Sequence, residues 1–259
     1  MDKEVFAGIL AFVEARRKAE GGYGLTPLLP ATVEDTYHAL RTLETVRGVS
    51  WLKKVFSQGL LKTYLASLAE TPWISARTFF QALYCSSLAD LAFDTGKTMN
   101  YLEQTLSKTT ALSERYYCAR TLREALAVDD MAVMRKARMV RFSRWRTARE
   151  LWMKLYLRQG SSSFEPEQKG KMVRWLQACQ NGDGGFGFLP GTTSYIENCH
   201  ICTRALAFLN ANPFDVEGCR HFVLACKSGN GGFARSPGSA PFLDATSHAV
   251  AVMNLLKGC

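Results

Sequence analysis

The sequence lacks the features that would place a chain across a membrane. Its 259 residues contain no uninterrupted apolar stretch of about 18 residues, the minimum for a spanning helix. The first residues also lack a basic leader and a small-residue cleavage site, so they do not resemble a signal peptide. We therefore expect a cytoplasmic protein with no transmembrane segment.

Strand-like alternation of apolar and polar residues is almost absent, whereas apolar residues recur at helical spacing along most of the chain. An apolar fraction of 47% is enough to bury a substantial core. The eight cysteines are scattered through the helical patterns, unlike the disulfide framework of a short secreted protein. We expect reduced and mostly buried thiols.

Acidic residues are too few to balance the basic ones, and the net charge is +9. This charge suits an anionic partner such as nucleic acid, a phosphate-bearing ligand or an acidic membrane surface. Segment 135–149, RKARMVRFSRWRTAR, concentrates arginine with Phe142 and Trp145 between the basic residues. No recognised nucleic-acid motif accompanies it, so nucleic acid is the weaker candidate.

A glycine–aromatic motif occurs three times. Each copy has a glycine pair followed by an aromatic residue, then a short loop and a helical pattern that begins close to an acidic residue. The three copies lie at residues 21–23, 184–186 and 231–233. Repetition with such a period indicates stacked or ring-closed structural units.

Helical patterns come in pairs along the whole chain. The second helix of each pair is expected to start near residues 34, 76, 114, 146, 197 and 244, which gives about six helical hairpins. Other expected helices cover 51–69, 131–141 and 143–158. No hairpin can bury its apolar face alone, so we predict an all-α fold, an α/α toroid formed by residues 1–259 as a single domain.

The glycine–aromatic turn, with an acidic-x-Thr or acidic-x-Cys helix start after it, resembles the repeat of the protein prenyltransferase β subunits and of the related squalene and triterpene cyclases. The resemblance is most specific at residues 20–46 and 180–256 and closest to the β subunits. It implies a toroid with inner and outer helices and a funnel lined by the inner ones.

The prenyltransferase branch holds a zinc ion with an Asp-x-Cys pair at one inner-helix start and a His at the next. In this chain the resemblance assigns Glu197 and Cys199 to the first start, and His248 or Asp244 to the second. The family position of the His matches Ser247, one residue before His248, which is a rotation of about 100° on a helix. The zinc would bind an acceptor thiol and lower its pKa. Without a metal, Cys199 is a small buried residue at a helix seam.

The same branch holds the diphosphate of its isoprenoid substrate with basic residues at the funnel mouth. The resemblance therefore makes Arg141, Arg144 and Arg149, together with Tyr195, the predicted substrate-binding residues. A solvated outer face is the alternative for these arginines.

The leading hypothesis is a prenyltransferase-like protein that binds an isoprenoid diphosphate and transfers the prenyl group to a thiol acceptor with zinc assistance. A protein acceptor or an α-subunit-like partner would go with it. The second hypothesis is a non-catalytic toroid that binds a protein or lipid partner. The third is a terpene cyclase-like enzyme, which needs an Asp-x-Asp-Asp cluster; the nearest match, Asp129-Asp130, lacks the preceding acid.

Overall fold

The computed structural model describes residues 3–56, 59–68, 74–128, 131–140, 142, 144–159 and 164–258. They belong to two compact units: unit 1 comprises residues 1–14 and 142–259, and unit 2 comprises residues 15–141. Helix dominates both units, which confirms the all-α prediction. That all 259 residues form one domain stays a prediction.

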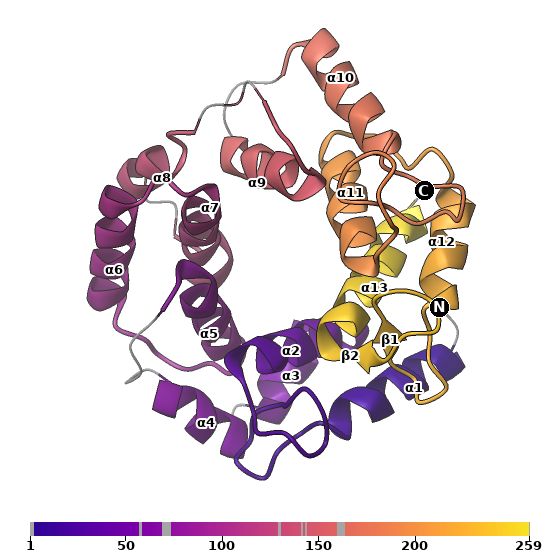
Figure 1. Ribbon diagram of the computed structural model, residues 1–259. Helices are drawn as coiled ribbons and strands as arrows, with labels where there is room; N and C mark the ends of the chain where they lie inside the picture. Colours follow the sequence, from indigo (N-terminus) through magenta and orange to yellow (C-terminus); the bar gives the residue numbers. More distant parts are fainter. Residues whose placement is uncertain are drawn as a thin grey trace. The chain divides into compact units, whose positions relative to one another are not determined.

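Unit 1 contains two layers of helices (Figure 1). In the first layer α11 (Ile196–Phe208) lies between α9 (Ala148–Arg158) and α13 (Leu243–Leu255). The second layer consists of α10 (Pro166–Gln177), α12 (Val216–Ala225) and α1 (Lys3–Glu14). The short antiparallel pair β1 (Phe233–Ala234) and β2 (Pro241–Phe242) precedes α13, and the 3₁₀ helix η2 (Leu256–Gly258) follows it.

Unit 2 has the same plan. Its first layer consists of α2 (Val33–Arg47), α5 (Ala76–Leu88) and α7 (Leu112–Arg120), and α7 continues into a π-helical turn, η1 (Thr121–Ala125). The second layer consists of α3 (Val49–Phe56), α4 (Leu60–Leu68), α6 (Thr95–Lys108) and α8 (Met131–Ala137). The first-layer helices of both units begin within two residues of the predicted starts.

Three expected helices differ from the structure. The helix expected at 51–69 is two helices, α3 and α4, and Gly59 directly before α4 has φ +109°, which a continuous helix cannot contain. The helix expected at 131–141 ends at Ala137. The helix expected at 143–158, whose start was counted near 146, begins at Ala148, because Thr147 is extended and its side chain accepts the backbone N–H of Glu150 as an N-cap.

The glycine pair of the repeated motif allows a turn to dock on a second-layer helix. Gly184 has φ +83°, and a Cβ added to it would lie 2.1 Å from the carbonyl oxygen of Gly218 in α12. Gly185 lies against the ring of Phe222, one helical turn further along α12. The other two copies dock in the same way: Gly21 and Gly22 on Leu60 and Tyr64 of α4, and Gly231 and Gly232 on Gly8 and Phe12 of α1.

The aromatic residue of the motif ties the turn to the helix that follows it. Phe233 is fully buried, and its backbone N–H donates to Thr246 Oγ1 at 2.9 Å. In unit 2 the buried Tyr23 donates in the same way to Thr36 Oγ1 at 3.0 Å. The threonine of the acidic-x-Thr helix start is therefore a structural hook that closes the repeat.

Candidate functional site

The first-layer helices of unit 1 begin at the same end of the unit, and backbone hydrogen bonds hold these starts together. Ala148, the first residue of α9, donates its N–H to the carbonyl of Phe188 at 2.8 Å. Ile196, the first residue of α11, donates at 2.9 Å to the carbonyl of Arg235, which directly follows β1, and β1 pairs with the strand β2 that immediately precedes α13. Three helix N-termini, each with a partial positive charge, therefore face one side of the unit.

One ion pair joins the starts of α9 and α11, and a second lies at the start of α13. Arg149 of α9 pairs with Glu197 of α11, and both side chains are close to half exposed. Arg235 pairs with Asp244 of α13 through Nη2 and Oδ2 at 2.8 Å. The carboxylate of Glu197 thus holds the Arg149 guanidinium at the start of α11, and the carboxylate of Asp244 holds the Arg235 guanidinium at the start of α13.

A histidine pair lies about one turn deeper. His200 of α11 and His248 of α13 approach through their Nδ1 atoms at 2.9 Å, with ring centroids 5.0 Å apart and ring planes 36° from each other. Both side chains are half-buried. His200 shares a face of α11 with Glu197 and Arg204, and His248 shares a face of α13 with Asp244.

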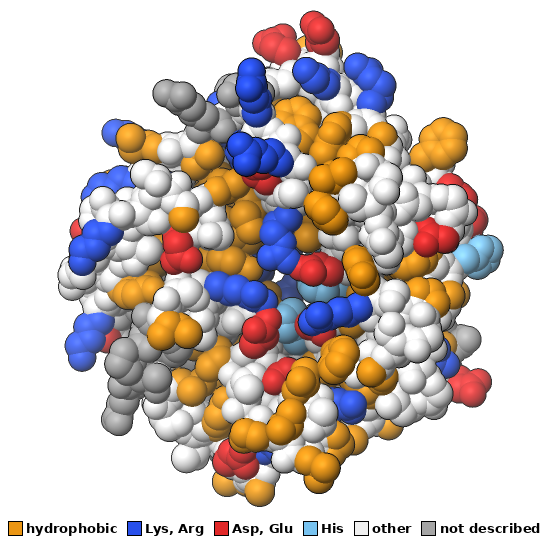
Figure 2. All heavy atoms as spheres, in the orientation of Figure 1, with side chains coloured by type: hydrophobic (Ala, Val, Ile, Leu, Met, Phe, Trp, Pro, Cys, Tyr) orange, Lys and Arg blue, Asp and Glu red, His pale blue; other side chains and the backbone are white. Residues whose placement is uncertain are grey.

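This half-exposed stripe is the polar side of the first layer in unit 1. Figure 2 shows histidine, basic and acidic side chains gathered beside α11 and α13 on the face in view. At the α9 side of the stripe the guanidinium group of Arg204 lies 4.6 Å from the ring centroid of Trp152. The stripe therefore combines cations, carboxylates and imidazoles next to an aromatic surface.

Three of the four predicted substrate-binding residues lie in or near this region. Arg149 belongs to the ion pair with Glu197, and Arg144 is exposed a few residues before α9. Tyr195 directly precedes α11 and is 43% exposed, and its backbone N–H donates to Phe186 O. Arg141 lies outside the described residues. That these residues bind substrate stays a prediction.

Cys199 has the role that threonine has in the other two repeats. Its sulfur is hydrogen-bonded to the backbone of Phe186, the aromatic residue of the motif, as the hydroxyl of Thr246 is to Phe233. The thiol also bonds to Cys219 of α12 and is completely buried. Burial, reinforced by the Cys219 thiol, raises the pKa of Cys199 well above its ordinary value. This environment is that of an unreactive structural thiol.

The four predicted zinc ligands do not form one donor set in this arrangement. Cys199 is engaged by Cys219, Glu197 by Arg149, Asp244 by Arg235, and Nδ1 of His248 by His200. No group of three or more His, Cys, Asp or Glu side chains in the described ranges is arranged to hold a metal ion. The donors present do not fit a zinc ion without rearrangement. Zinc binding stays a prediction.

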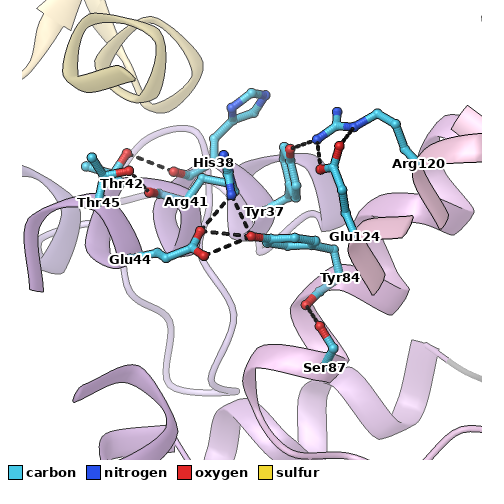
Figure 3. Close-up of polar contacts among 10 residues, drawn as sticks. All are labelled: Tyr37, His38, Arg41, Thr42, Glu44, Thr45, Tyr84, Ser87, Arg120 and Glu124. Atoms are coloured by element: carbon cyan, nitrogen blue, oxygen red, sulfur yellow. Dashed lines mark hydrogen bonds and ion pairs between the residues drawn. The ribbon is translucent and has the colours of Figure 1, made fainter. Parts of the chain in front are cut away.

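Sequence reasoning missed a buried polar network in unit 2 (Figure 3). Arg41 of α2 donates to Tyr84 OH at 2.5 Å and to Glu44 at 2.7 Å, and Tyr84 of α5 donates to Glu44 at 2.9 Å. Burial, together with the neighbouring Glu44 carboxylate, raises the pKa of Tyr84. The phenol therefore stays protonated and keeps donating to Glu44.

The second half of this network surrounds Arg120 at the junction of α7 and η1. Arg120 is 6% exposed, donates to Glu124 at 2.5 and 2.9 Å and to Tyr37 OH at 3.1 Å, and lies 4.1 Å from the ring centroid of Phe80. Carboxylates of the chain already pair with the guanidinium groups of both Arg41 and Arg120. We therefore assign this network the structural role of joining α2, α5 and α7. The sequence did contain a signal for this network, namely oppositely charged residues three or four positions apart within helices that are otherwise largely apolar.

Paired helices in two layers, closed by repeated glycine–aromatic turns, define an all-α repeat protein of the α/α-hairpin class. The family model of the prenyltransferase alpha-alpha toroid domain matches residues 1–115 and 146–258, so the chain belongs to this family. This match confirms the predicted toroid fold and the resemblance at the level of the superfamily. Comparison with curated proteins gave no match. Within the described residues, no helix combines the length and apolar character needed to cross a bilayer.

Proposed function

We propose that the chain binds an isoprenoid diphosphate, with the diphosphate at the N-terminal ends of α9, α11 and α13. The observation that carries this proposal is the convergence of three helix N-termini with the guanidinium groups of Arg149 and Arg235. Backbone N–H groups at helix starts and arginine side chains are the groups that proteins use to hold phosphates. Arg144, exposed a few residues before α9, would add charge there. The predicted role of Arg141 lies outside the described residues.

The carboxylates in this region hold the arginines in place and leave them able to bind an anion. Glu197 and Arg149 are close to half exposed, so their pairing is screened by water and weak. A diphosphate carries more negative charge than one carboxylate and can replace it as the partner of Arg149. Tyr195, exposed at the same end, offers an aromatic ring and a hydroxyl to the ligand.

The test is calorimetric titration with farnesyl diphosphate, with farnesol as the uncharged comparison. We expect binding of the diphosphate, no measurable binding of farnesol, and about 10-fold weaker binding for Arg149→Gln, because one charge-assisted hydrogen bond is lost. Arg158→Gln is the control, since Arg158 is the exposed last residue of α9, at the opposite end of the same helix from Arg149. Equal affinity of Arg149→Gln and wild type would refute the proposed site.

The second candidate is a non-catalytic toroid that binds a protein or lipid partner, and the burial of Cys199 against Cys219 favours it over zinc-assisted thiol transfer. Metal analysis of protein purified without a metal-binding tag separates the two. About one zinc per chain that is lost in Cys199→Ala would support transfer with zinc assistance. Protein without zinc would support the binding role or a transfer that uses other residues.

A further inference from the structure

Basic and aromatic side chains of unit 1 lie together at α10 and at the segment that precedes α9. Helix α10 buries Met172 and Leu176 and exposes Lys171 and Arg174. The half-buried Trp175 follows Arg174 and lies one turn beyond Lys171. Figure 2 shows basic and hydrophobic side chains together beside α10. The basic–aromatic surface consists of six residues: Arg144, Trp145, Arg146, Lys171, Arg174 and Trp175.

A contact between two tryptophans joins the two segments of this surface. The ring centroids of Trp145 and Trp175 are 6.1 Å apart, and the ring planes meet at 81°, which is an edge-to-face contact. Arg144 and Arg146 are the chain neighbours of Trp145, and both are exposed. The ring contact therefore brings these two arginines to the side of α10.

The segment before α9 is held in place by two residues of α9. The backbone N–H of Arg146 donates to Glu150 Oε2 at 2.8 Å, and the carbonyl of Arg144 accepts from Nζ of Lys154. Lys154 is only 7% exposed and pairs with Glu150 at 2.7 Å. The backbone on both sides of Trp145 is therefore fixed, while the side chains of Arg144 and Arg146 remain exposed.

The basic–aromatic surface has charge of one sign that the chain does not neutralise. Among the residues that the structure describes, no carboxylate lies within ion-pair distance of its four cations. By contrast, Arg149 and Arg235 of the candidate site are both paired with carboxylates. The acidic residues near α10, Glu165 and Glu167, lie at its start, about two turns before Arg174. The surface is therefore complementary to a partner of dense negative charge.

We propose that the basic–aromatic surface binds lipid bilayers that contain anionic lipids. Its cations lie at the phosphate headgroups, and its two tryptophans lie at the boundary between headgroups and acyl chains. Tryptophan is enriched at this level of a membrane, and clustered Lys and Arg on an amphipathic helix are attracted to anionic lipid. Nucleic acid fits less well, because base stacking needs an open ring face and each half-buried ring already contacts the other. The inference is independent of the proposed binding of an isoprenoid diphosphate.

The test is co-sedimentation of the full chain with phosphatidylcholine vesicles, with and without phosphatidylserine as the anionic lipid. We expect binding to the anionic vesicles only. The double variant Lys171→Gln, Arg174→Gln should partition about 30-fold more weakly, since each cation near such a surface strengthens partitioning about fivefold. The matched control, Lys3→Gln with Lys227→Gln, removes two exposed cations elsewhere in unit 1 and should weaken partitioning less than about threefold. Equal losses in the two double variants, or no binding to anionic vesicles, would overturn the proposal.

The second measurement is quenching of tryptophan fluorescence by brominated phosphatidylcholine in the same anionic vesicles. We expect quenching in wild type and loss of most of it in the double variant Trp145→Phe, Trp175→Phe, which keeps an aromatic ring at both positions. Full quenching in this variant would overturn the placement of the indoles. Binding to duplex DNA that falls in the Lys171 and Arg174 variant, without binding to anionic vesicles, would overturn the membrane in favour of nucleic acid. The charge variants change only exposed side chains, so they decide the proposal if the tryptophan variant does not fold.

Discussion

Replacing Gly184 with alanine should detach the second glycine turn from α12. A Cβ at Gly184 would lie 2.1 Å from the carbonyl oxygen and 2.2 Å from the carbonyl carbon of Gly218, and real Cβ atoms essentially never come within 3.0 Å of such atoms. The obstructing atoms belong to the backbone, so no change of rotamer relieves the clash. The turn and α12 must separate by most of an ångström, which also pulls Gly185 away from Phe222.

Two effects contribute to the expected loss of stability. The φ of Gly184 is +83°, where alanine costs about 1–2 kcal/mol more than glycine. Forcing an extra methyl group into a packed interface costs about 1–3 kcal/mol. We therefore expect Gly184→Ala to lower the free energy of unfolding by about 3 kcal/mol.

Two nearby glycines separate these effects. Gly191 has φ +80° with nothing within 4 Å of its Cβ position, so Gly191→Ala isolates the backbone strain and should cost about 1 kcal/mol. Gly182 has neither a clash nor a left-handed φ, so Gly182→Ala should change stability by less than about 0.5 kcal/mol. Urea unfolding followed by far-ultraviolet circular dichroism measures all three variants. The docking explanation is refuted if Gly184→Ala is no less stable than Gly191→Ala.

Three further changes test other parts of the fold. Thr246→Val removes the acceptor of the Phe233 N–H and should cost about 1–3 kcal/mol in urea unfolding, whereas Thr246→Ser should retain most of the stability; equal losses would contradict the hook. Arg120→Met leaves the Glu124 carboxylate without its guanidinium partner and should lower the free energy of unfolding by about 3 kcal/mol. Adding Glu124→Leu should recover part of this loss, and no recovery would contradict the ion-pair explanation. Burial raises the pKa of Cys226 from 9.0 to about 12, so the unfolded thiol ionises first and the native state holds the extra proton. The stability that the protonated Cys226 thiol contributes is complete below about pH 9 and falls by up to about 1.4 kcal/mol per pH unit towards pH 12. In urea unfolding at several pH values, the free energy of unfolding should therefore decline less steeply with pH for Cys226→Ala than for wild type. Parallel curves would contradict the raised pKa.

The fold could be predicted from the sequence because its signals are local and repeated. Helical periodicity gave the first-layer starts within two residues, and the glycine pairs located the turns. The chain breaks were harder to predict. The interruption before α4 depends on the backbone of Gly59, and the late start of α9 depends on the cap formed by Thr147, one residue in a segment that otherwise has helical composition.

The predicted site residues that the structure describes lie at or near helix starts, and that they form a site stays a prediction; the direction of each side chain was not predictable from the sequence. Neighbouring residues on a helix point about 100° apart, so one position decides whether a group faces the second layer or the half-exposed stripe. Cys199 turns towards α12 because it accepts the hydrogen bond that closes the turn at Phe186. His200, one residue later, turns to the stripe and to His248. The buried charges of unit 2 were missed for a related reason, since composition does not tell which charged residues a neighbouring helix covers.

Comparison of the three repeats separates the residues that the turn requires from those that it leaves free to vary. The hook position holds Thr36, Cys199 and Thr246, three side chains of similar size that can each accept one backbone N–H. The next position along the helix differs in every copy: Tyr37, His200 and Ser247. The turn imposes no requirement on this second position, so its residues are set by whatever each helix faces. The imidazole at this position in α11 contacts His248, so α11 differs from the other two helices in chemistry at a position that the turn leaves free to vary.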